Sequence, residues 1–555
     1  MDAAMVRAGM GKYDELNKDE LVRLLEARDR REATRFGLVW EAGAEKETGL
    51  NNDYVALDLV PELCHGPGPW TNLVIEGDNF DALRALRPGY SGKFRLLATD
   101  PPYNTGNRDF LYNDRFLDKE DLWRHSKWLE FMSQRLNLAR DLLAENAAAF
   151  IHIDDNEVFH LGLLMNKIFG EKNFIANVIW QKRYAPPNDH KAIAALHEYV
   201  LAYQCSDLWL RRLLPRGSEK DEQYKFEDDR GVFRLSDYTC NKSAEERPNL
   251  YYPIINPNTG VESWPKRTRV WAYSRDESTR HLAENSIYWG KDGKGKVPAF
   301  KRYRHMLRNA DGVVPHTWWG FEEVGHNDEA KKELMAILPE MARAFSTPKP
   351  TRLLDRILQI GCDESGIVLD MFAGSGTTGH AVMKANAADG GARRFVLISN
   401  SEATADEPDK NLCRDVCAER LRRVAGGYRK ADGTEVAGLG GGFAYLRCRR
   451  VAASELLEMD HPAVWTALQL RHGQQVGPYD GAAAFQWTEF EGAALCYVPR
   501  WNKGVVAALR RRIESAGAVT LCSWQPALGR QYFPHPLVCH EGLPGGLTRP
   551  FGLRL

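Results

Sequence analysis

Four consecutive residues combine chemical groups that suit a flat aromatic base carrying an exocyclic amine. They are Asp100, Pro101, Pro102 and Tyr103, and they come at the end of the apolar segment FRLLATD. Such an amine is a poor nucleophile because its lone pair is delocalised into the ring, so a site that activates it needs acceptors for both amine hydrogens. The Asp100 carboxylate and the Pro101 carbonyl supply two acceptors, and the Tyr103 ring supplies a stacking face. The consecutive prolines stiffen the turn and would hold these groups in place.

A glycine-rich turn is the second candidate, in the run DMFAGSGTTG at 370–379. It follows an apolar segment and leads into a helical pattern, and its glycines let the backbone approach a bound cofactor closely. The residues of this run that we expect to bind a cofactor are Asp370, Phe372, Ala373, Gly374, Ser375, Gly376 and Thr377.

Taken alone, the glycine turn leaves more than one cofactor open. It lacks the Lys-Ser/Thr pair of a P-loop, but it is close enough to G-x-G-x-x-G that a nicotinamide enzyme remains an alternative. Gly290 to Lys296 does fit G-x-x-x-x-G-K, yet Val297 stands where a magnesium-binding hydroxyl is required. Either motif by itself also occurs as an ordinary structural turn, so the interpretation depends on both together.

Short apolar strands alternate with helical patterns around both motifs, which predicts an α/β fold with a doubly wound parallel sheet. Ligands in such sheets bind at the carboxyl ends of the strands, where both motifs lie. Between about 206 and 345 the alternation is lost, which indicates an inserted domain of irregular β character. The expected domains are an N-terminal extension at 1–70 with a surface or dimer helix at 18–34, the first half of the α/β domain at 71–205, and the insert at 206–345. The second half of the α/β domain follows at 346–445, and a small C-terminal α+β module at 446–555.

The overall charge of the chain gives no sign of a nucleic-acid partner. Lysine and arginine number 74 against 75 for aspartate and glutamate, so any DNA-binding residues must be concentrated locally. The insert offers such a concentration, with basic residues interleaved with Trp264 and Trp271 and a second basic loop further on. The candidates for DNA binding are Lys266, Arg267, Arg269, Lys294 and Lys296.

Composition narrows the class of protein further. Hydrophobic residues make up 43% and charged residues 27%, which is typical of globular proteins, and 555 residues are too many for one hydrophobic core. No apolar run approaches a membrane span and the first residues lack the core of a secretion signal, so we expect a cytoplasmic protein without a membrane partner. The ten cysteines form no C-x-x-C pair, which indicates reduced structural thiols and no metal site.

Together, the two motifs resemble the β-group of amino-methylating DNA methyltransferases, and in particular the modification subunits of type III restriction-modification systems. In that group the target-amine motif precedes the cofactor loop, and a target-recognition domain lies between them. The likeness runs from about Asn72 to Tyr445 through the matching stretches IEGDNFDAL, DPPYNTG, IDDNE, FGEKNF, RPNLYYPI, STPKPTRLL and FAGSGTTGHAV.

The resemblance implies a Rossmann-like methyltransferase sheet with permuted motif order and S-adenosylmethionine as cofactor. It implies that Asp100 to Tyr103 hold the target adenine and that Phe372 to Gly376 line the cofactor pocket. It places Asp78 near the cofactor's adenine and the segment with Thr347 and Lys349 near its amino-acid end. Glu402, after the segment RRFVLIS, is our choice for the ribose hydroxyls, although it could equally be a surface glutamate.

The function implied is methylation of the N6 amine of adenine in double-stranded DNA. Methylation of the N4 amine of cytosine is an alternative, which Asp at position 100 in place of Ser disfavours. A DNA-recognition subunit without chemistry of its own is a second alternative. The expected partners are DNA, a second copy of the chain, and a separate restriction (helicase-nuclease) or other defence-system subunit.

Overall fold

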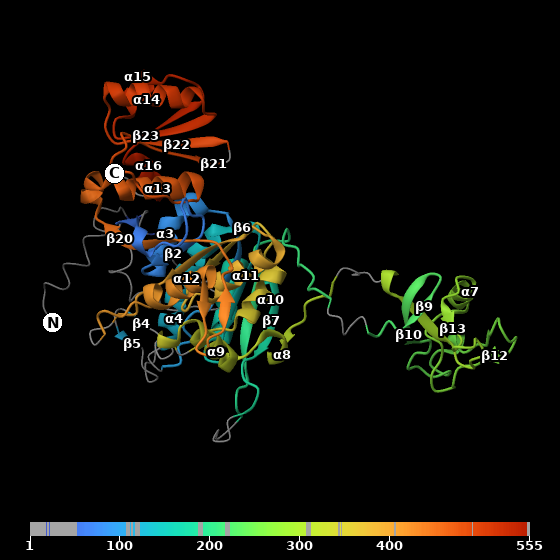
Figure 1. Cartoon of the computed structure of the whole chain (residues 1–555). Coiled ribbons are helices and arrows are strands. Elements are labelled where there is room, and N and C mark those ends of the chain that lie inside the picture. Colours follow the sequence, from blue (N-terminus) through green and yellow to red (C-terminus); the bar gives the residue numbers. More distant parts are fainter. Residues whose placement is uncertain are drawn as a thin grey trace. The chain divides into compact units, whose positions relative to one another are not determined.

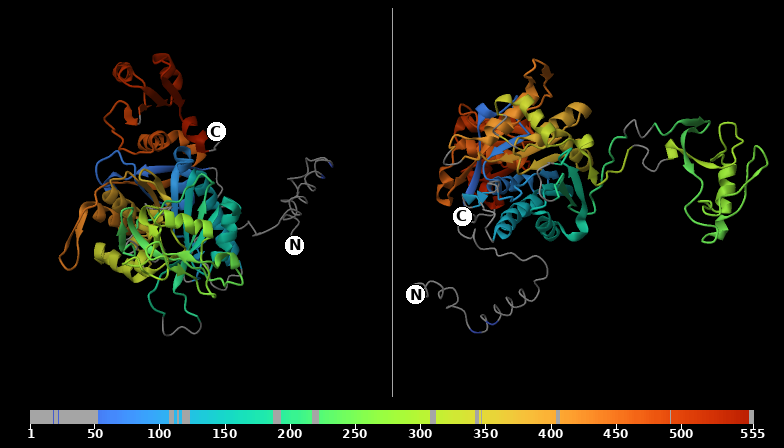
Figure 2. Two further views of the ribbon diagram at one scale, coloured as in Figure 1. Left: turned by 90° about the vertical axis from the view of Figure 1, so that its right-hand side faces the viewer. Right: turned by 90° about the horizontal axis from the view of Figure 1, so that it is seen from below.

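The computed structural model describes residues 18, 22, 53–106, 111–112, 115–116, 123–186, 193–216, 222–306, 312–341, 345, 347–403, 407–490 and 492–551. The helix expected at 18–34 lies outside the described residues except for Lys18 and Val22. The chain forms two compact units, Met1–Arg211 with His316–Leu555, and Arg212–Pro315. Figure 1 labels the elements of both units, and Figure 2 gives two further views.

A ten-stranded sheet organises the larger unit. Its strands, in spatial order, are β1 (Tyr54–Leu59), β20 (Ala444–Val451), β2 (Leu73–Glu76), β17 (Arg394–Ser399), β16 (Ile367–Asp370), β3 (Phe94–Thr99), β6 (Leu143–Ile153), β8 (His197–Gln204), β7 (Phe174–Gln181) and β15 (Trp318–Trp319). The strands from β20 to β6 run parallel, whereas β8 is antiparallel to both β6 and β7. The predicted α/β class with a parallel central sheet is therefore confirmed.

The strand order explains how two distant motifs come together. β16 pairs with β3 on one side and with β17 on the other, although almost 270 residues separate β3 from β16 in the chain. The chain continues from β16 to β17 on one side of this pair and from β3 to β6 on the other side. The boundary between β3 and β16 is therefore the topological switch point at which α/β sheets bind ligands. The turns after β3 and β16 are therefore neighbours.

Helices cover both faces of the sheet because apolar residues on each strand alternate in direction. Leu97, Leu369 and Ile398 pack in one core with α3 (Asn79–Tyr90), α4 (Arg124–Leu142) and α5 (Val158–Phe169). On the other face lie α10 (Thr351–Gly361) and α11 (Thr377–Asp389), which come so close to the strands that a Cβ at Gly361 or Gly379 would contact Leu96 or Leu397.

The insert is a small β unit built around aromatic side chains. Its main sheet has the order β13 (Ile287–Tyr288), β14 (Ala299–Tyr303), β10 (Gly231–Asp237) and β9 (Phe226–Asp228), and α7 (Arg275–Ala283) begins at a capping box formed by Ser274 and Glu277. The unit spans 212–315, shorter than the predicted 206–345. The reason is that α8 (Phe321–Val324) and α9 (Asn327–Ile337) pack against α10 and α12 (Glu419–Gly426) of the larger unit.

The C-terminal part of the larger unit adds a second, four-stranded sheet. Its strands are β21 (Gln486–Phe490), β22 (Ala493–Val498), β23 (Ala518–Ser523) and β24 (Val538–Gly542), and the last three run parallel. Figure 1 shows α14 (Lys503–Glu514) and α15 (Pro526–Tyr532) on one face and α13 (His461–Gly473) on the other, where α13 also contacts β1 and α3. The predicted boundary at 445/446 falls inside β20, which pairs with both β1 and β2. Among the described residues, no helix is both long and apolar enough to cross a membrane.

Candidate active site

The turn after β3 carries a cluster of charged side chains. The Tyr103 hydroxyl lies 2.7 Å from Asp100 Oδ1 and 3.0 Å from Glu198 Oε2. Lys349 Nζ donates to the Tyr103 hydroxyl at 2.8 Å and to Glu198 Oε2 at 3.0 Å, and lies 3.2 Å from Asp100 Oδ2. Lys182 Nζ donates to the other oxygen of Glu198 at 3.0 Å. Two carboxylates and two ammonium groups therefore balance each other around one tyrosine.

Glu198 and Lys349 keep only 7% and 10% of their side chains exposed, whereas Asp100 keeps 30%, so the charges around Glu198 act on one another strongly. Burial raises the pKa of Glu198, but the charges of Lys349 and Lys182 outweigh it and lower that pKa to about 2. Burial lowers the pKa of Lys349, but Asp100 and Glu198 outweigh it and raise that pKa above its usual value. The pKa of Tyr103 is well above its usual value, first because it is buried and then because of Asp100 and Glu198. The cluster thus contains a permanently ionised Glu198 and a neutral Tyr103 near neutral pH.

The backbone of the same turn is held by α4. Trp128 Nε1 donates to the Pro102 carbonyl at 2.7 Å, and the indole of Trp128 is fully buried. This bond occupies the Pro102 carbonyl and anchors the Pro-Pro segment to the helix below it. The Pro101 carbonyl remains the one that we predict as the second acceptor for an amine hydrogen.

The turn after β16 is shaped by glycines in the left-handed region. Gly374 has φ +49° and Gly376 has φ +75°, a conformation that other residues adopt at a cost. A Cβ at Gly374 would lie 2.9 Å from the Phe345 ring, and one at Gly376 would lie 3.1 Å from the Cys417 carbonyl oxygen. Only glycine fits both the dihedral angles and the space at these positions.

Asp370 braces this turn from within. It is buried and accepts hydrogen bonds from the Thr99 hydroxyl at 3.0 Å, the Phe372 amide at 3.1 Å and the Thr378 hydroxyl at 2.5 Å. Burial raises the pKa of Asp370 to about 6, while the bonds from Thr378, Phe372 and Thr99 oppose that rise. Because Thr99 directly precedes Asp100, one carboxylate connects the two turns.

Arg420 on α12 is a second brace that sequence reasoning missed. Its side chain is fully buried and donates to the Thr377 hydroxyl at 2.8 Å, the Ser375 hydroxyl at 3.3 Å and Glu333 Oε2 at 3.1 Å. The side chains of Ser375 and Thr377 therefore point into the protein. Thr377 also donates to the Lys349 carbonyl at 3.3 Å, so the segment that begins at Thr347 lies beside the glycine turn.

The remaining predicted cofactor residues follow β2 and β17 or precede α10. Asp78 caps α3, accepts from Arg135 Nη2 at 3.0 Å, and keeps 48% of its side chain exposed. Glu402 follows β17, pairs with Lys410 at 3.3 Å and keeps 44% exposed. Thr347 is exposed, whereas the Lys349 ammonium is turned toward Asp100 and Tyr103. Asp78 therefore does cap its helix, and both carboxylates remain partly exposed.

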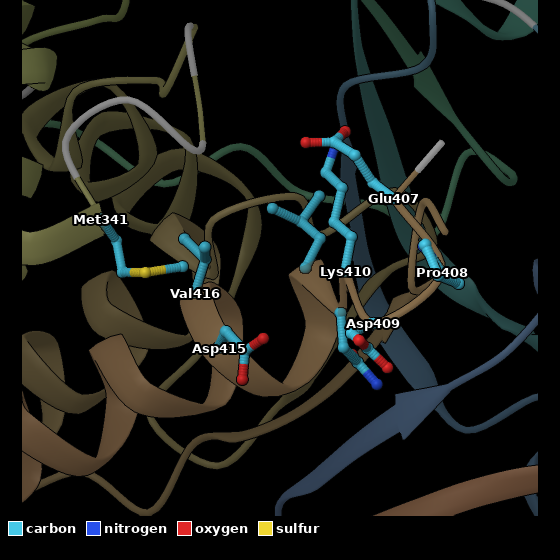
Figure 3. Close-up of a pocket in the computed structure, with 9 residues that line it drawn as sticks. Met341, Glu407, Pro408, Asp409, Lys410, Asp415 and Val416 are labelled. Atoms are coloured by element: carbon cyan, nitrogen blue, oxygen red, sulfur yellow. The ribbon is translucent and has the colours of Figure 1, made fainter. Parts of the chain in front are cut away.

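A cavity of about 420 Å³ is lined in part by Lys410, the ion-pair partner of Glu402. Figure 3 shows Met341 and Val416 on one side of it and Glu407 and Pro408 on the other. The remaining lining residues are Asp409, Lys410, Asn411, Leu412 and Asp415. The structure thus holds open space next to the carboxylate that we predict for the ribose hydroxyls.

The residues present fit S-adenosylmethionine. The glycine turn after β16 admits no side chain, and the next two strands on one side of it, β17 and β2, lead to the partly exposed carboxylates Glu402 and Asp78. Carboxylates accept hydrogen bonds from hydroxyl and amino groups and attract cations, and the cofactor carries a diol, an amine and a sulfonium. Phe372 adds a half-buried ring at the start of the turn.

The DNA-binding candidates of the insert are spread over its surface. Lys266, Arg267, Lys294 and Lys296 are exposed, whereas Arg269 donates to Asp237 at 2.9 Å. Trp264 is 50% exposed and suits stacking. Trp271, the second tryptophan interleaved with the basic residues, is 1% exposed in the core of the unit, because its indole packs on Tyr238 and donates to the Tyr252 carbonyl.

Comparison with known proteins places the chain among DNA methylases. The pattern that defines the N6/N4 DNA methylase family matches residues 94–403. The Mod subunit of the type III restriction-modification enzyme StyLTI from Salmonella typhimurium is 34% identical over 477 residues, which cover 79% of this chain and 70% of that subunit. The EcoP15I Mod subunit from Escherichia coli is 29% identical over 64% of this chain and 63% of its own length. The probable HindVI Mod subunit from Haemophilus influenzae is 44% identical over 69% of this chain and 54% of its own length.

Proposed function

Because this chain belongs to the N6/N4 DNA methylase family, we propose that it methylates the N6 amine of adenine in double-stranded DNA at a specific site. We further propose that it is the modification subunit of a restriction-modification system, as its relatives are named. The observation that carries the proposal is the position of Asp100 and Tyr103 at the carboxyl end of β3, next to the glycine turn of β16. The two turns are neighbours, as transfer of a methyl group from a cofactor to a base would require.

Bound S-adenosylmethionine supplies a methyl group on a sulfonium, which is electrophilic enough to react with a weak nucleophile. The protein's part is to bind the adenine and to direct the lone pair of N6. Asp100 and the Pro101 carbonyl accept the two amine hydrogens, and Tyr103 stacks on the ring. These contacts direct the N6 lone pair toward the methyl group that the bound cofactor would supply, and Asp100 would take up the proton that N6 loses.

The contacts of Asp100 are compatible with this role. Tyr103 and Lys349 each approach one of its oxygens, and every carboxylate oxygen can accept more than one hydrogen bond. Lys349 contacts both Asp100 and Tyr103, Glu198 contacts Tyr103, and these contacts hold the two side chains in place. Lys349 therefore acts on the target-base side of the site, in addition to the role of its backbone carbonyl beside the glycine turn.

Adenine is the proposed target in preference to cytosine because Asp, and not Ser, occupies position 100. The test is methyl transfer from labelled S-adenosylmethionine to plasmid DNA, followed by digestion and identification of the modified nucleoside. We expect N6-methyladenine. Detection of N4-methylcytosine would select the alternative base, and binding of DNA without transfer would select a recognition subunit without chemistry.

The proposed partners follow from the same assignment. The insert would contact DNA through Lys266, Arg267, Arg269, Lys294 and Lys296, the chain would act in the cytoplasm as a homodimer, and a separate chain would supply restriction. Sedimentation of the purified protein with and without a DNA duplex measures the stoichiometry. A monomer on DNA would contradict the homodimer.

A further inference from the structure

Glu157, the last residue of the stretch IDDNE, is a buried carboxylate that the proposed reaction does not use. Its side chain is 0% exposed, and it stands at the N-terminal end of α5. Asn104, which directly follows Tyr103, donates from Nδ2 to Glu157 Oε1 at 2.5 Å. A buried charge must be compensated by hydrogen bonds or opposite charge, so this contact is a strong structural constraint.

Asn104 needs such a constraint because of its backbone. It has φ +58°, in the left-handed region that non-glycine residues adopt at a cost, and it is 1% exposed. Its Nδ2 also donates to the Arg124 carbonyl at 3.3 Å. The chain therefore turns sharply immediately after Tyr103, and Asn104 is tied at this point to α4 and to Glu157.

The first turn of α4 supplies a second donor to the same carboxylate. His125 Nδ1 lies 2.7 Å from Glu157 Oε1, and Arg124 Nε donates to His125 Nε2 at 3.2 Å. Because Nε2 accepts, a neutral His125 carries its hydrogen on Nδ1 and donates it to Glu157. On the other side, His160 Nδ1 lies 2.8 Å from Glu157 Oε2.

Two histidines and a carboxylate this close together also have the composition of a metal site. The hydrogen-bond pattern argues against that use. A metal ligand needs a free lone pair, whereas His125 Nδ1 keeps its proton as long as Arg124 donates to Nε2, and the Arg124 guanidinium repels a cation. Glu157 is therefore better described as a hydrogen-bond acceptor for its neighbours than as a metal ligand.

We propose that Glu157 is a positioning residue for methyl transfer, which fixes the Asp100–Tyr103 turn by holding Asn104. The turn is then anchored on both sides, since Trp128 holds the Pro102 carbonyl and Glu157 holds the residue after Tyr103. Glu157 is fully buried, so it does not contact the base itself. The inference rests on the proposed adenine methylation.

The charge of Glu157 makes this anchor sensitive to pH. Burial raises the pKa of Glu157 to about 7, against the opposing effects of Asn104, His160 and Arg124. The pKa of His125 is lowered, first by burial and then by Arg124, so His125 is neutral when Glu157 ionises. The carboxylate accepts charge-assisted hydrogen bonds that are stronger than those of the neutral acid. The anchor is therefore strongest above about pH 7 and weakens as Glu157 takes up a proton.

The first test replaces the charge and keeps the shape. Glu157→Gln should lower kcat by roughly 10- to 100-fold through misplacement of the turn, with KM for S-adenosylmethionine and DNA affinity unchanged. It should also remove the acid limb near pH 7 from the kcat profile. Glu145→Gln, a change of an exposed glutamate on β6, is the matched control and should alter neither. A Glu157→Gln enzyme with the wild-type kcat and pH profile would overturn the proposal.

The second test separates the anchor from the backbone conformation. Asn104→Gly accepts the left-handed dihedral angles but loses the side chain, so it should be as slow as Glu157→Gln, and the double variant should be no slower. If Asn104→Gly is fully active, the conformation alone matters and the proposal fails. Hydrogen exchange of the peptide 100–106 should be faster in both variants, as a readout that does not require turnover. If the wild-type protein transfers no methyl group, the proposed function fails, while the exchange measurement still decides whether Glu157 holds the turn.

Discussion

The two turns at the switch point of the sheet are built in opposite ways. The turn after β3 is held by its side chains, through the charges of Lys349, Glu198 and Lys182 around Tyr103 and Asp100. The turn after β16 takes its shape from its backbone, with Gly374 and Gly376 in the left-handed region, and Asp370 and Arg420 brace it from inside the protein. In the proposed function, the first turn presents chemical groups to a base, whereas the second leaves room for a cofactor. The difference predicts that substitutions in each turn have separable effects.

The largest expected effect concerns the reacting groups of the first turn. Asp100→Ala should lower the rate of methyl transfer on the order of 10² or more, because it removes an acceptor aimed at the amine. Tyr103→Ala should also abolish detectable transfer. Single-turnover kinetics measures the rate, and calorimetry should show that S-adenosylmethionine still binds. Near-normal turnover of Asp100→Ala would remove this residue from the mechanism.

A change in the second turn should act on binding instead of on the chemical step. Gly374→Val places a branched side chain at φ +49° and against the Phe345 ring, so affinity for S-adenosylmethionine should fall at least about tenfold. Gly376→Val should behave in the same way. Gly390→Val is the control, since Gly390 also has positive φ but a Cβ there meets nothing within 4 Å. Equal affinities for S-adenosylmethionine in the folded Gly374→Val and Gly390→Val variants would show that the cofactor binds elsewhere.

A substitution of Glu198 tests whether methyl transfer needs the charged cluster around Tyr103 as a whole. Glu198→Gln leaves Lys349 and Lys182 without their shared counter-charge, so Lys349 should shift and kcat should fall by roughly tenfold, less than for Asp100→Ala. Affinity for S-adenosylmethionine should change little if the comparison of the two turns holds. A large loss of cofactor affinity with unchanged kcat would show that Lys349 serves the cofactor and not the turn after β3.

The smallest effect on the reaction is expected from the insert. Replacing Lys266, Arg267 and Arg269 together by alanine should weaken DNA binding and reduce the slope of log K against log salt by roughly 0.9 for each lost phosphate contact. Arg269 should contribute least because it already pairs with Asp237. Cofactor binding should survive. An unaltered affinity and salt slope would leave these residues as ordinary surface charges.

The exposed basic residues of the insert were predictable because long charged side chains stay at the surface in most environments. Its aromatic residues were not. Trp264 and Trp271 are equivalent in the sequence pattern, yet one is exposed and the other fills the core. Which tryptophan is buried depends on how Tyr238, Tyr252 and Ile287 pack together, and no local pattern contains that information.

The sequence by itself determined the motifs, their order and the fold class. Asp100–Tyr103 and the glycine run are contiguous, and the strand-helix alternation around them depends on local apolar periodicity, so both can be read along the chain. The antiparallel strand β8 was missed, and with it Glu198, which faces the site only because β8 pairs with β6 and β7. Isolated glutamates and arginines in the sequence resemble surface charges.

Only the tertiary structure decided which side chains support the two turns. Glu198, Lys349, Arg420 and Glu157 come from distant elements, and their chemistry depends on burial and on neighbours that the sheet brings together. Lys349 was expected near the cofactor from its sequence motif, and the direction of its ammonium follows from two carboxylates far away in the chain, Asp100 after β3 and Glu198 on β8. Buried charges acquire a function from their partners, and the pairing of partners is a property of the folded chain.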